Sequence, residues 1–265
     1  MIKTLMKIIC FIHDGQEQYA VNEGDTIRLL DGSPYQEVVL TDTRLENNGI
    51  VLSAPCQPTK IIAMGLNYHS HAKEMGHKIP NSPLTFLKPS TSVIGHEEKI
   101  IYPAASSRVD FEGELAVVIK KIAWSVPRHK AFDYVLGYTC FNDVTARDLQ
   151  AQDCQWTRAK GFDTFAAVGP WIETDLNAES LNIETRLNGV LKQKGNTCDL
   201  IYTIPEIINF ISNVMTLMPG DIIATGTPAG IGPMHPGDCV EVEIEGIGTL
   251  RNYVVTNGHH GYSHL

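Results

Sequence analysis

The sequence lacks any apolar run approaching the roughly 18 to 20 residues that a membrane-spanning helix needs. Its apolar opening, residues 1–12, has a charged start, but no small-residue cleavage site follows, so we expect a first β-strand and a cytoplasmic protein. Basic residues are fewer than acidic ones, so the formal net charge is -9 and the isoelectric point is about 5.5. These values argue against nucleic acid or an anionic membrane as a partner, since both select a clustered basic surface.

Paired cysteines and nucleotide-binding motifs are absent as well. The six cysteines are scattered without a C-x-x-C pair, so we expect reduced, structural thiols at Cys10, Cys56, Cys140, Cys154, Cys198 and Cys239. Cys140 and Cys154 flank Asp143, but no partner histidine is evident, and packing is favoured over a nucleophilic role. The glycine-rich stretch 224–232 lacks the Lys-Ser/Thr of a P-loop and the spacing of a dinucleotide fingerprint.

With 265 residues, 43% of them hydrophobic, the chain can bury a substantial core. Short apolar runs and turn signals predict a small β-rich N-terminal module over residues 1–55, a main domain over 56–258, and a tail over 259–265 without a role. The main domain reads as mixed α+β and dominated by strands, which we expect at 60–64, 85–88, 111–121, 135–141, 183–187, 222–225 and 239–244. One clear helix is expected at 204–215, and Asn188-Gly189 predicts a two-residue hairpin.

Two glutamates one residue apart, Glu112 and Glu114, are the most informative feature. Residues two apart on a strand share a face, and the continuation 115–119 reads as a buried strand. Asp143 ends a second apolar run and could join them. Two carboxylates about 4 Å apart repel by roughly 4 kcal/mol at an effective dielectric near 20, so three in one cleft would neutralise or recruit a cation. Three oxygen ligands suit Mg²⁺ or Mn²⁺, although a solvated outer face is the simpler interpretation of the glutamates alone.

A histidine and a glutamate stand one helical turn apart in the stretch 67–76, which reads as a short helix closed by Gly76. Glu74 would orient His71 and raise its basicity, as a general base for water requires. The alternative is an ordinary surface ion pair. Glycines at both ends of this helix also suit a lid.

Further polar residues follow Asp143. The stretch 143–150 predicts a helix that places Arg147 and Gln150 on the face of Asp143, where Arg147 could hold an anionic substrate group or pair with Asp148 or Asp153. Lys160 stands between small residues and, if buried beside carboxylates, would stabilise negative charge. Thr227 and backbone amides of the glycine-rich loop could hold a carboxylate.

These stretches together resemble the fumarylacetoacetate hydrolase family over about residues 60 to 255. The resembling motifs are G-L-N-Y through His71 and Glu74, F-L-K-P at 86–89, D-F-E-G-E-L-A-V-V-I at 110–119, N-D-V-T-A-R-D at 142–148, W-T-R-A-K-G-F-D-T-F at 156–165 and A-T-G-T-P at 224–228. Six motifs in this order are specific for the family but not for a substrate.

The resemblance implies a β-roll catalytic domain, a homodimer, and Mg²⁺ (or Mn²⁺) held by Glu112, Glu114 and Asp143. It implies that a lid carrying His71 and Glu74 closes over substrate and activates water, with Lys160 near the metal. Arg147, Gln150 and Thr227 match substrate-contacting positions. The small-molecule partner would be a 2-oxo or 2,4-dioxo acid that chelates the metal.

For a 2,4-dioxo acid, this picture predicts hydrolysis of an acylpyruvate, in which water attacks C4 and pyruvate leaves as a metal-stabilised enolate. With oxaloacetate, the same site could interconvert keto and enol forms or release CO₂. An isomerase or decarboxylase of dienedioates is a third interpretation, and a metal-stabilised protein that only binds a 2-oxo acid is a fourth. The possible water-activating pair favours the hydrolase.

Overall fold

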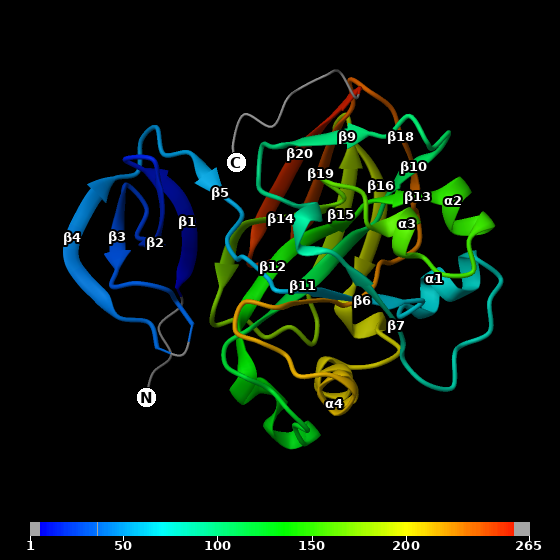
Figure 1. Ribbon diagram of the computed structural model, residues 1–265, viewed down its shortest axis with the longest axis horizontal. Helices are drawn as coiled ribbons and strands as arrows, with labels where there is room; N and C mark the ends of the chain where they lie inside the picture. Colours follow the sequence, from blue (N-terminus) through cyan, green and yellow to red (C-terminus); the bar gives the residue numbers. More distant parts are fainter. Residues whose placement is uncertain (1–5, 36, 257–265) are drawn as a thin grey trace.

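The computed structural model describes residues 6–35 and 37–256, and most of its regular structure is β-strand. Twelve strands of this part of the chain form one large sheet that crosses the whole molecule (Figure 1). Its order is β4 (Leu40–Glu46), β3 (Thr26–Leu30), β2 (Gln16–Asn22), β1 (Lys7–His13), β14 (Ala166–Glu173), β12 (Val135–Asp143), β11 (Gly113–Ile119), β17 (Ile222–Ala224), β6 (Ile61–Gly65) and β7 (Leu84–Lys88). Two short strands are added, β5 (Leu52–Ser53) beside β1 and β8 (Val93–Ile94) beside β14.

A second sheet packs against the centre of the first. Its order is β16 (Val190–Asn196), β15 (Asn182–Leu187), β19 (Cys239–Ile244), β20 (Gly248–Thr256) and β9 (Lys99–Tyr102). Side chains of β11 alternate between two cores, because Leu115 and Val117 join a cluster with Val242 of the second sheet, whereas Ala116 and Val118 join a cluster on the other face. Burial on both faces explains the unbroken apolar sequence of this strand.

A small three-stranded sheet lies beside the ends of β11 and β12. It consists of β13 (Thr145–Ala146), β10 (Val109–Phe111) and β18 (Gly232–Met234). In this sheet Asp110 pairs with Thr145, which holds the chain just before Glu112 and just after Asp143 in extended form.

The N-terminal strands form consecutive hairpins, as the turn signals predict, and lie at the left of Figure 1. Asp14 and Gly15 both have positive φ in the turn between β1 and β2, which is the conformation that a tight hairpin requires. This module is not a separate sheet, because Lys7 and Ile8 pair with the end of β14. The boundary at residues 55–56 stays a prediction, and the predicted tail 259–265 lies outside the described residues.

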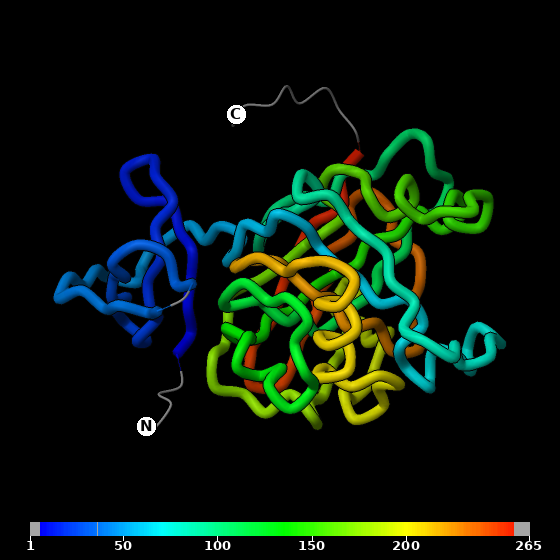
Figure 2. Tube along the Cα trace, turned by 60° about the horizontal axis from the view of Figure 1, so that its bottom comes forward, coloured from blue at the N-terminus to red at the C-terminus, as the bar shows by residue number. Residues whose placement is uncertain are grey.

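The helices are few and short. They are α1 (His69–Glu74), α2 (Arg147–Gln152), α3 (Thr157–Lys160) and α4 (Ile204–Val214), with 3₁₀ turns at Ser90–Ser92, Arg128–Tyr134 and Thr197–Asp199. Helix α4 begins as predicted, with Pro205 in its first turn and the Glu206 carboxylate accepting from the Thr203 amide at 3.0 Å. The first three helices gather on the side of the molecule opposite the module, as both views show (Figures 1 and 2). Within residues 6–35 and 37–256, no helix is both long and apolar enough to cross a membrane.

Most predicted strands form within two residues of their expected bounds, and the Asn188-Gly189 hairpin is confirmed with positive φ at both residues. Two expectations are wrong. The single strand 111–121 is interrupted at Glu112, where β10 ends and β11 has not begun. The helix expected from Asp143 begins only at Arg147, because residues 145–146 pair with β10 and stay extended.

Candidate active site

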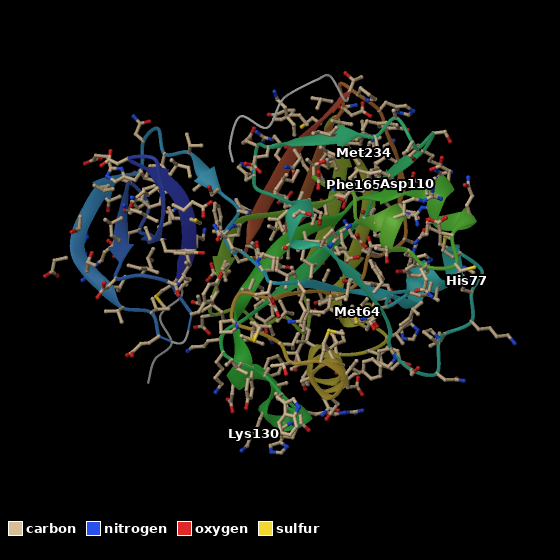
Figure 3. All side chains as sticks on the ribbon, in the orientation of Figure 1. Met64, His77, Asp110, Lys130, Phe165 and Met234 are labelled. Atoms are coloured by element: carbon tan, nitrogen blue, oxygen red, sulfur yellow. The ribbon has the colours of Figure 1, made fainter. Side chains whose placement is uncertain are left out.

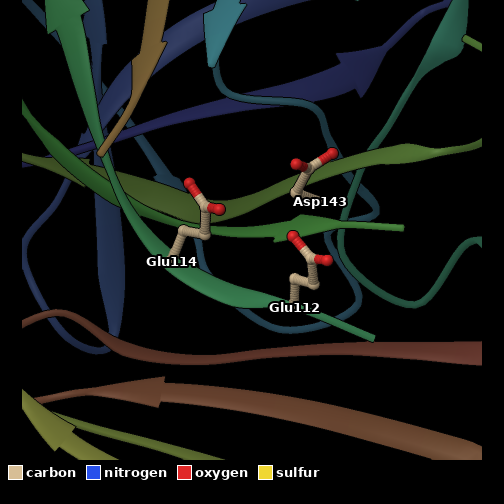
Figure 4. A group of neighbouring side chains, drawn as sticks. All are labelled: Glu112, Glu114 and Asp143. Carbon is tan, nitrogen blue, oxygen red and sulfur yellow. The ribbon is translucent and has the colours of Figure 1, made fainter. Parts of the chain in front are cut away.

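The three carboxylates predicted from the sequence lie together at the ends of adjacent strands. One oxygen from each of Glu112, Glu114 and Asp143 lies within 4.8 Å of the others, and all three residues are buried (Figure 4). Strand pairing brings them together, since Glu114 pairs with Phe141 on β12 and the Asp143 amide donates to the Glu112 carbonyl at 2.9 Å. Asn142 fixes the backbone between them, because its Oδ1 accepts from the Glu112 amide at 3.0 Å.

Buried cations surround two of the three carboxylates. Lys160 Nζ lies 2.9 Å from Glu112 Oε2 and 2.6 Å from Asp143 Oδ2, and Lys88 Nζ donates to Asp143 Oδ1 from the opposite side. Arg147 reaches Glu112 Oε1 through one terminal nitrogen, and its Nε lies 2.9 Å from Asp110 Oδ2. These pairs neutralise Glu112 and Asp143 in a place where an uncompensated charge would be costly.

Glu114 differs from its neighbours. Among the described residues, no lysine or arginine forms an ion pair with it, and its Oε2 accepts from the Gly226 amide at 2.8 Å. Burial, followed by the charges of Asp143 and Glu112, raises the pKa of Glu114 well above the usual value. Burial works in the same direction on Glu112, but Lys160 and Arg147 outweigh it and hold the pKa of Glu112 well below the usual range.

This charge distribution fits a divalent cation. The three donors are carboxylate oxygens, the ligands that Mg²⁺ and Mn²⁺ prefer, and sulfur or imidazole is absent from the cluster. The environment of Glu114 also fits a cation. Its carboxyl group has no ion-pair partner among the described residues, and a bound cation would supply one.

His71 and Glu74 form the hydrogen-bonded pair expected on α1, with 2.9 Å between His71 Nδ1 and Glu74 Oε2. The histidine is buried, and the glutamate side chain is one-third exposed. Gly76 has positive φ and follows the helix end, as a glycine in this position typically does.

The loop after β17 connects this pair to the carboxylate cluster. The Gly226 amide binds Glu114, and the Gly230 amide donates to Glu74 Oε1 at 2.9 Å. Gly226 has φ +102°, and a Cβ there would approach the Asn67 side chain to 2.9 Å, so only glycine fits. The amides of this loop therefore hold carboxylates, as expected, but the carboxylates belong to the protein itself.

One cavity of about 670 Å³ joins these groups. Its lining includes seven of the nine predicted site residues, namely His71, Glu112, Glu114, Arg147, Gln150, Lys160 and Thr227. The other two, Asp143 and Glu74, do not line the cavity but contact residues that do: Asp143 contacts Lys160, and Glu74 contacts His71. Residues that follow α1 line one part of the cavity, among them His77, which Figure 3 marks on the side of the molecule away from the N-terminal module.

Two details differ from expectation. Arg147 pairs with neither Asp148 nor Asp153, because the extended backbone before α2 turns it toward Asp110 and Glu112. Thr227 donates its hydroxyl proton to the Gly113 carbonyl at 2.8 Å and accepts from Gln193 Nε2, so it must exchange the first bond before it can donate to a substrate carboxylate.

Sequence reasoning assigned no role to Lys88, which is fully buried at the end of β7. Burial lowers the pKa of Lys88, against the opposing influence of Asp143. The available signal was a lysine that ends the apolar strand residues 84–87, a position where a charge needs a partner. Cys140 behaves as predicted for a packing residue, since burial raises the pKa of its thiol to about 12.

Comparison with known proteins places the chain among enzymes of organic acids. Residues 60–255 match the profile "Fumarylacetoacetate (FAA) hydrolase C-terminal", and residues 6–55 match "Rv2993c-like, N-terminal". The oxaloacetate tautomerase YisK of Bacillus subtilis is 42% identical over 220 residues, which cover 77% of this chain and 73% of that protein.

Two solved structures show the same fold. The 5-carboxymethyl-2-hydroxymuconate delta-isomerase from Mycobacterium smegmatis has a TM-score of 0.89 at 39% identity, covering 95% of this chain and 100% of that one. The maleylpyruvate hydrolase from Sphingobium sp. SYK-6, in complex with manganese(II) ion and pyruvate, has a TM-score of 0.79 at 32% identity, covering 96% and 100%.

Proposed function

The chain belongs to the fumarylacetoacetate hydrolase family, and from that premise we propose that it hydrolyses a C–C bond in acylpyruvate-like 2,4-dioxo acids with the help of a divalent metal. One observation carries the proposal: His71, which is paired with Glu74, lines the same cavity as Glu112 and Glu114 of the carboxylate cluster. Hydrolysis needs a base for water beside a site for the 2-oxo acid, whereas a tautomerase needs no attacking water.

Glu112, Glu114 and Asp143 would hold the metal, Mg²⁺ or Mn²⁺. The ion, when bound, supplies Lewis-acid polarisation of the substrate oxygens. The manganese ion and pyruvate in the Sphingobium hydrolase support both the metal and the class of ligand.

His71 acts as the base in this proposal. A carboxylate can only accept a hydrogen bond, so the Nδ1 of a neutral His71 carries the proton toward Glu74. Its Nε2 then has a free lone pair, which takes the proton of the attacking water. Glu74 is held in turn by the Gly230 amide, so the imidazole keeps one orientation.

Lys160 stabilises the negative charge that develops on the 2-oxo oxygen. Burial opposes its charge, but Asp143 and Glu112 outweigh burial and raise the pKa of Lys160, so the ammonium stays protonated. Arg147 and Gln150, which touch each other at the cavity wall, would receive the substrate carboxylate, with Thr227 on the cavity wall as a third contact.

Oxaloacetate tautomerisation or decarboxylation is the second candidate, and the 42% identity with the Bacillus subtilis tautomerase favours it. Isomerisation of dienedioates is a third, with the Mycobacterium smegmatis isomerase as its support. A protein that only binds a 2-oxo acid is disfavoured, because the carboxylates, the His71–Glu74 pair and Lys160 are all in place. The cytoplasmic location and the homodimer stay predictions.

The deciding experiment compares acetylpyruvate with enol-oxaloacetate on the purified, Mg²⁺-loaded protein. Loss of the enol absorbance is followed in the ultraviolet, and pyruvate is assayed in parallel. We expect pyruvate from acetylpyruvate. Rapid loss of enol-oxaloacetate without pyruvate, combined with an inert acetylpyruvate, would replace the hydrolase by the tautomerase.

A further inference from the structure

The active-site cavity has two chemically different sides. One part of its lining is apolar and comes from β6, β7 and residues next to β6, α1 and α3: Met64, Leu66, Met75, Leu84, Phe86 and Trp156. We call these six side chains the apolar wall. A cavity of about 670 Å³ has the size of sites for drug-sized ligands, far more than pyruvate itself needs.

The apolar wall begins directly beside the reacting centre. Lys160 Nζ lies 5.0 Å from the centre of the Phe86 ring, and that ring meets Trp156 edge to face with 5.2 Å between centroids. Leu84 and Trp156 then converge over Gly65, where an added Cβ would lie 3.0 Å from Leu84 and 2.9 Å from Trp156. Phe86, Trp156 and Leu84 are therefore neighbours in an apolar surface that begins beside Lys160.

Parts of this wall face water. Leu84 is 42% exposed and Met75 is 41% exposed. Apolar surface on a cavity wall gains free energy when a ligand covers it, so an apolar substituent is favoured there over a hydrated one.

From this arrangement we propose that the acyl group of the substrate ends in an apolar chain or ring that lies on the apolar wall, and that Leu84 helps to select it. The inference names the substrate class of the proposed hydrolase and rests on that function for the reaction. The apolar pocket itself can be tested by binding alone. A substrate as small as acetylpyruvate would leave most of the wall uncovered.

A histidine and a lysine that follow α1 suggest a competing substrate. His77 and Lys78 also line the cavity, and either could meet a second carboxylate at the far end of the substrate. Both are exposed, so water already solvates them, and an exposed ion pair is worth little. The six apolar side chains therefore favour the apolar tail.

Binding is tested with 2-oxo acids that the proposed hydrolysis cannot cleave. The dissociation constants of pyruvate, 2-oxobutanoate, 2-oxohexanoate and 2-oxooctanoate are measured calorimetrically with Mg²⁺-loaded protein, next to the diacid 2-oxoadipate. We expect affinity to rise about two- to fourfold with each methylene. Equal affinities along the series, or tighter binding of 2-oxoadipate than of 2-oxohexanoate, would overturn the proposal.

Turnover of acetyl-, hexanoyl- and benzoylpyruvate distinguishes a failure of the proposed substrate class from a failure of the proposed hydrolase activity. If none yields pyruvate although affinity still rises with tail length, the hydrolase fails and the apolar pocket stands. If acetylpyruvate is cleaved and longer tails bring no gain in kcat/KM, the hydrolase stands and the substrate class is wrong.

A matched pair of variants locates the selectivity. Leu84 and Leu87 lie on the same strand with similar exposure, 42% and 46%, but only Leu84 lines the cavity. We expect Leu84→Ala to lower the ratio of kcat/KM for hexanoylpyruvate over acetylpyruvate about fivefold, and Leu87→Ala to leave this ratio as it is. Equal ratios in the two variants would exclude Leu84 as a selective residue.

Discussion

The floor of the candidate active site and the segment that we predict to act as its lid are built in different ways. The floor comprises the three carboxylates with Lys88 and Lys160, and all five residues are buried. Ion pairs connect all of them except Glu114, and Asp143 contacts both lysines. The lid segment, residues 66–83, is exposed from 73 to 79. Asn67 holds its start through several hydrogen bonds to Tyr202 and Thr225, whereas the bonds made farther along the segment are single ones. Removing Asp143 or one of the two lysines leaves a buried charge without one of its partners, whereas removing one bond of the lid segment leaves groups that water can solvate.

The lid bonds can be named individually. Asp199 accepts from the Ser70 amide at 2.9 Å, the Tyr202 hydroxyl donates to the Pro80 carbonyl at 2.6 Å, and the Gly230 amide donates to Glu74. The first two bonds join the lid segment to residues 199–202, and the third joins it to the loop after β17. The comparison therefore predicts that floor variants lose function outright, whereas lid variants lose one step or a fraction of stability.

The largest effect is expected for Glu114→Gln. Glutamine keeps the size of the side chain and an oxygen for the Gly226 amide but removes the charge that a metal needs. We expect Mn²⁺ affinity to fall by more than about 100-fold and activity on every substrate to be lost. Mn²⁺ titration by calorimetry and a pyruvate assay check both results. Unchanged Mn²⁺ affinity would remove Glu114 from the metal site.

His71→Ala should cause the next largest loss. Without the base, hydrolysis should slow by about 10² to 10⁴-fold, and Mn²⁺ affinity should stay at the wild-type value because the floor is untouched. His69→Ala is the matched control, since His69 lies on the same helix, is exposed and does not line the cavity. A full hydrolytic rate in the His71 variant would refute its role in water activation.

The smallest effect is expected for Tyr202→Phe, which removes one lid bond. Its hydroxyl donates to Pro80, so we expect a loss of about 0.5–1.5 kcal/mol in the free energy of unfolding. The same change at Tyr68, whose buried hydroxyl has no hydrogen-bond partner among the described residues, should cost nothing or stabilise. Denaturant titrations of both variants test this difference. Equal losses would show that the bond to Pro80 does not hold the lid.

Local sequence patterns were enough to predict most elements and the shared face of Glu112 and Glu114. The apolar run 115–119 and the Asn188-Gly189 turn fix their own conformations, and Glu112 and Glu114 are close in the chain. The alternation of cores along β11 follows from the same run once a second sheet covers it. The sequence therefore predicts the structure correctly where the contacts that determine it are local.

The errors lie where distant segments decide. Lys88 and Asp143 are 55 residues apart, so no local pattern joins them. The start of α2 depends on the pairing of residues 145–146 with β10, and Arg147 faces Asp110 for the same reason. The engagement of the glycine-rich loop with Glu74 and Glu114 likewise requires the fold, because 156 and 112 residues separate the partners.

The glycine at position 226 has a consequence for protein engineering. Gly226 has a positive φ, lies close to Asn67 and donates a hydrogen bond from its amide to Glu114. A substitution there therefore disturbs the floor and the start of the lid segment together. Leu84 and Met75, by contrast, are exposed and contribute little to the core. A library that seeks new acyl preferences should therefore vary the apolar wall and leave the loop after β17 untouched.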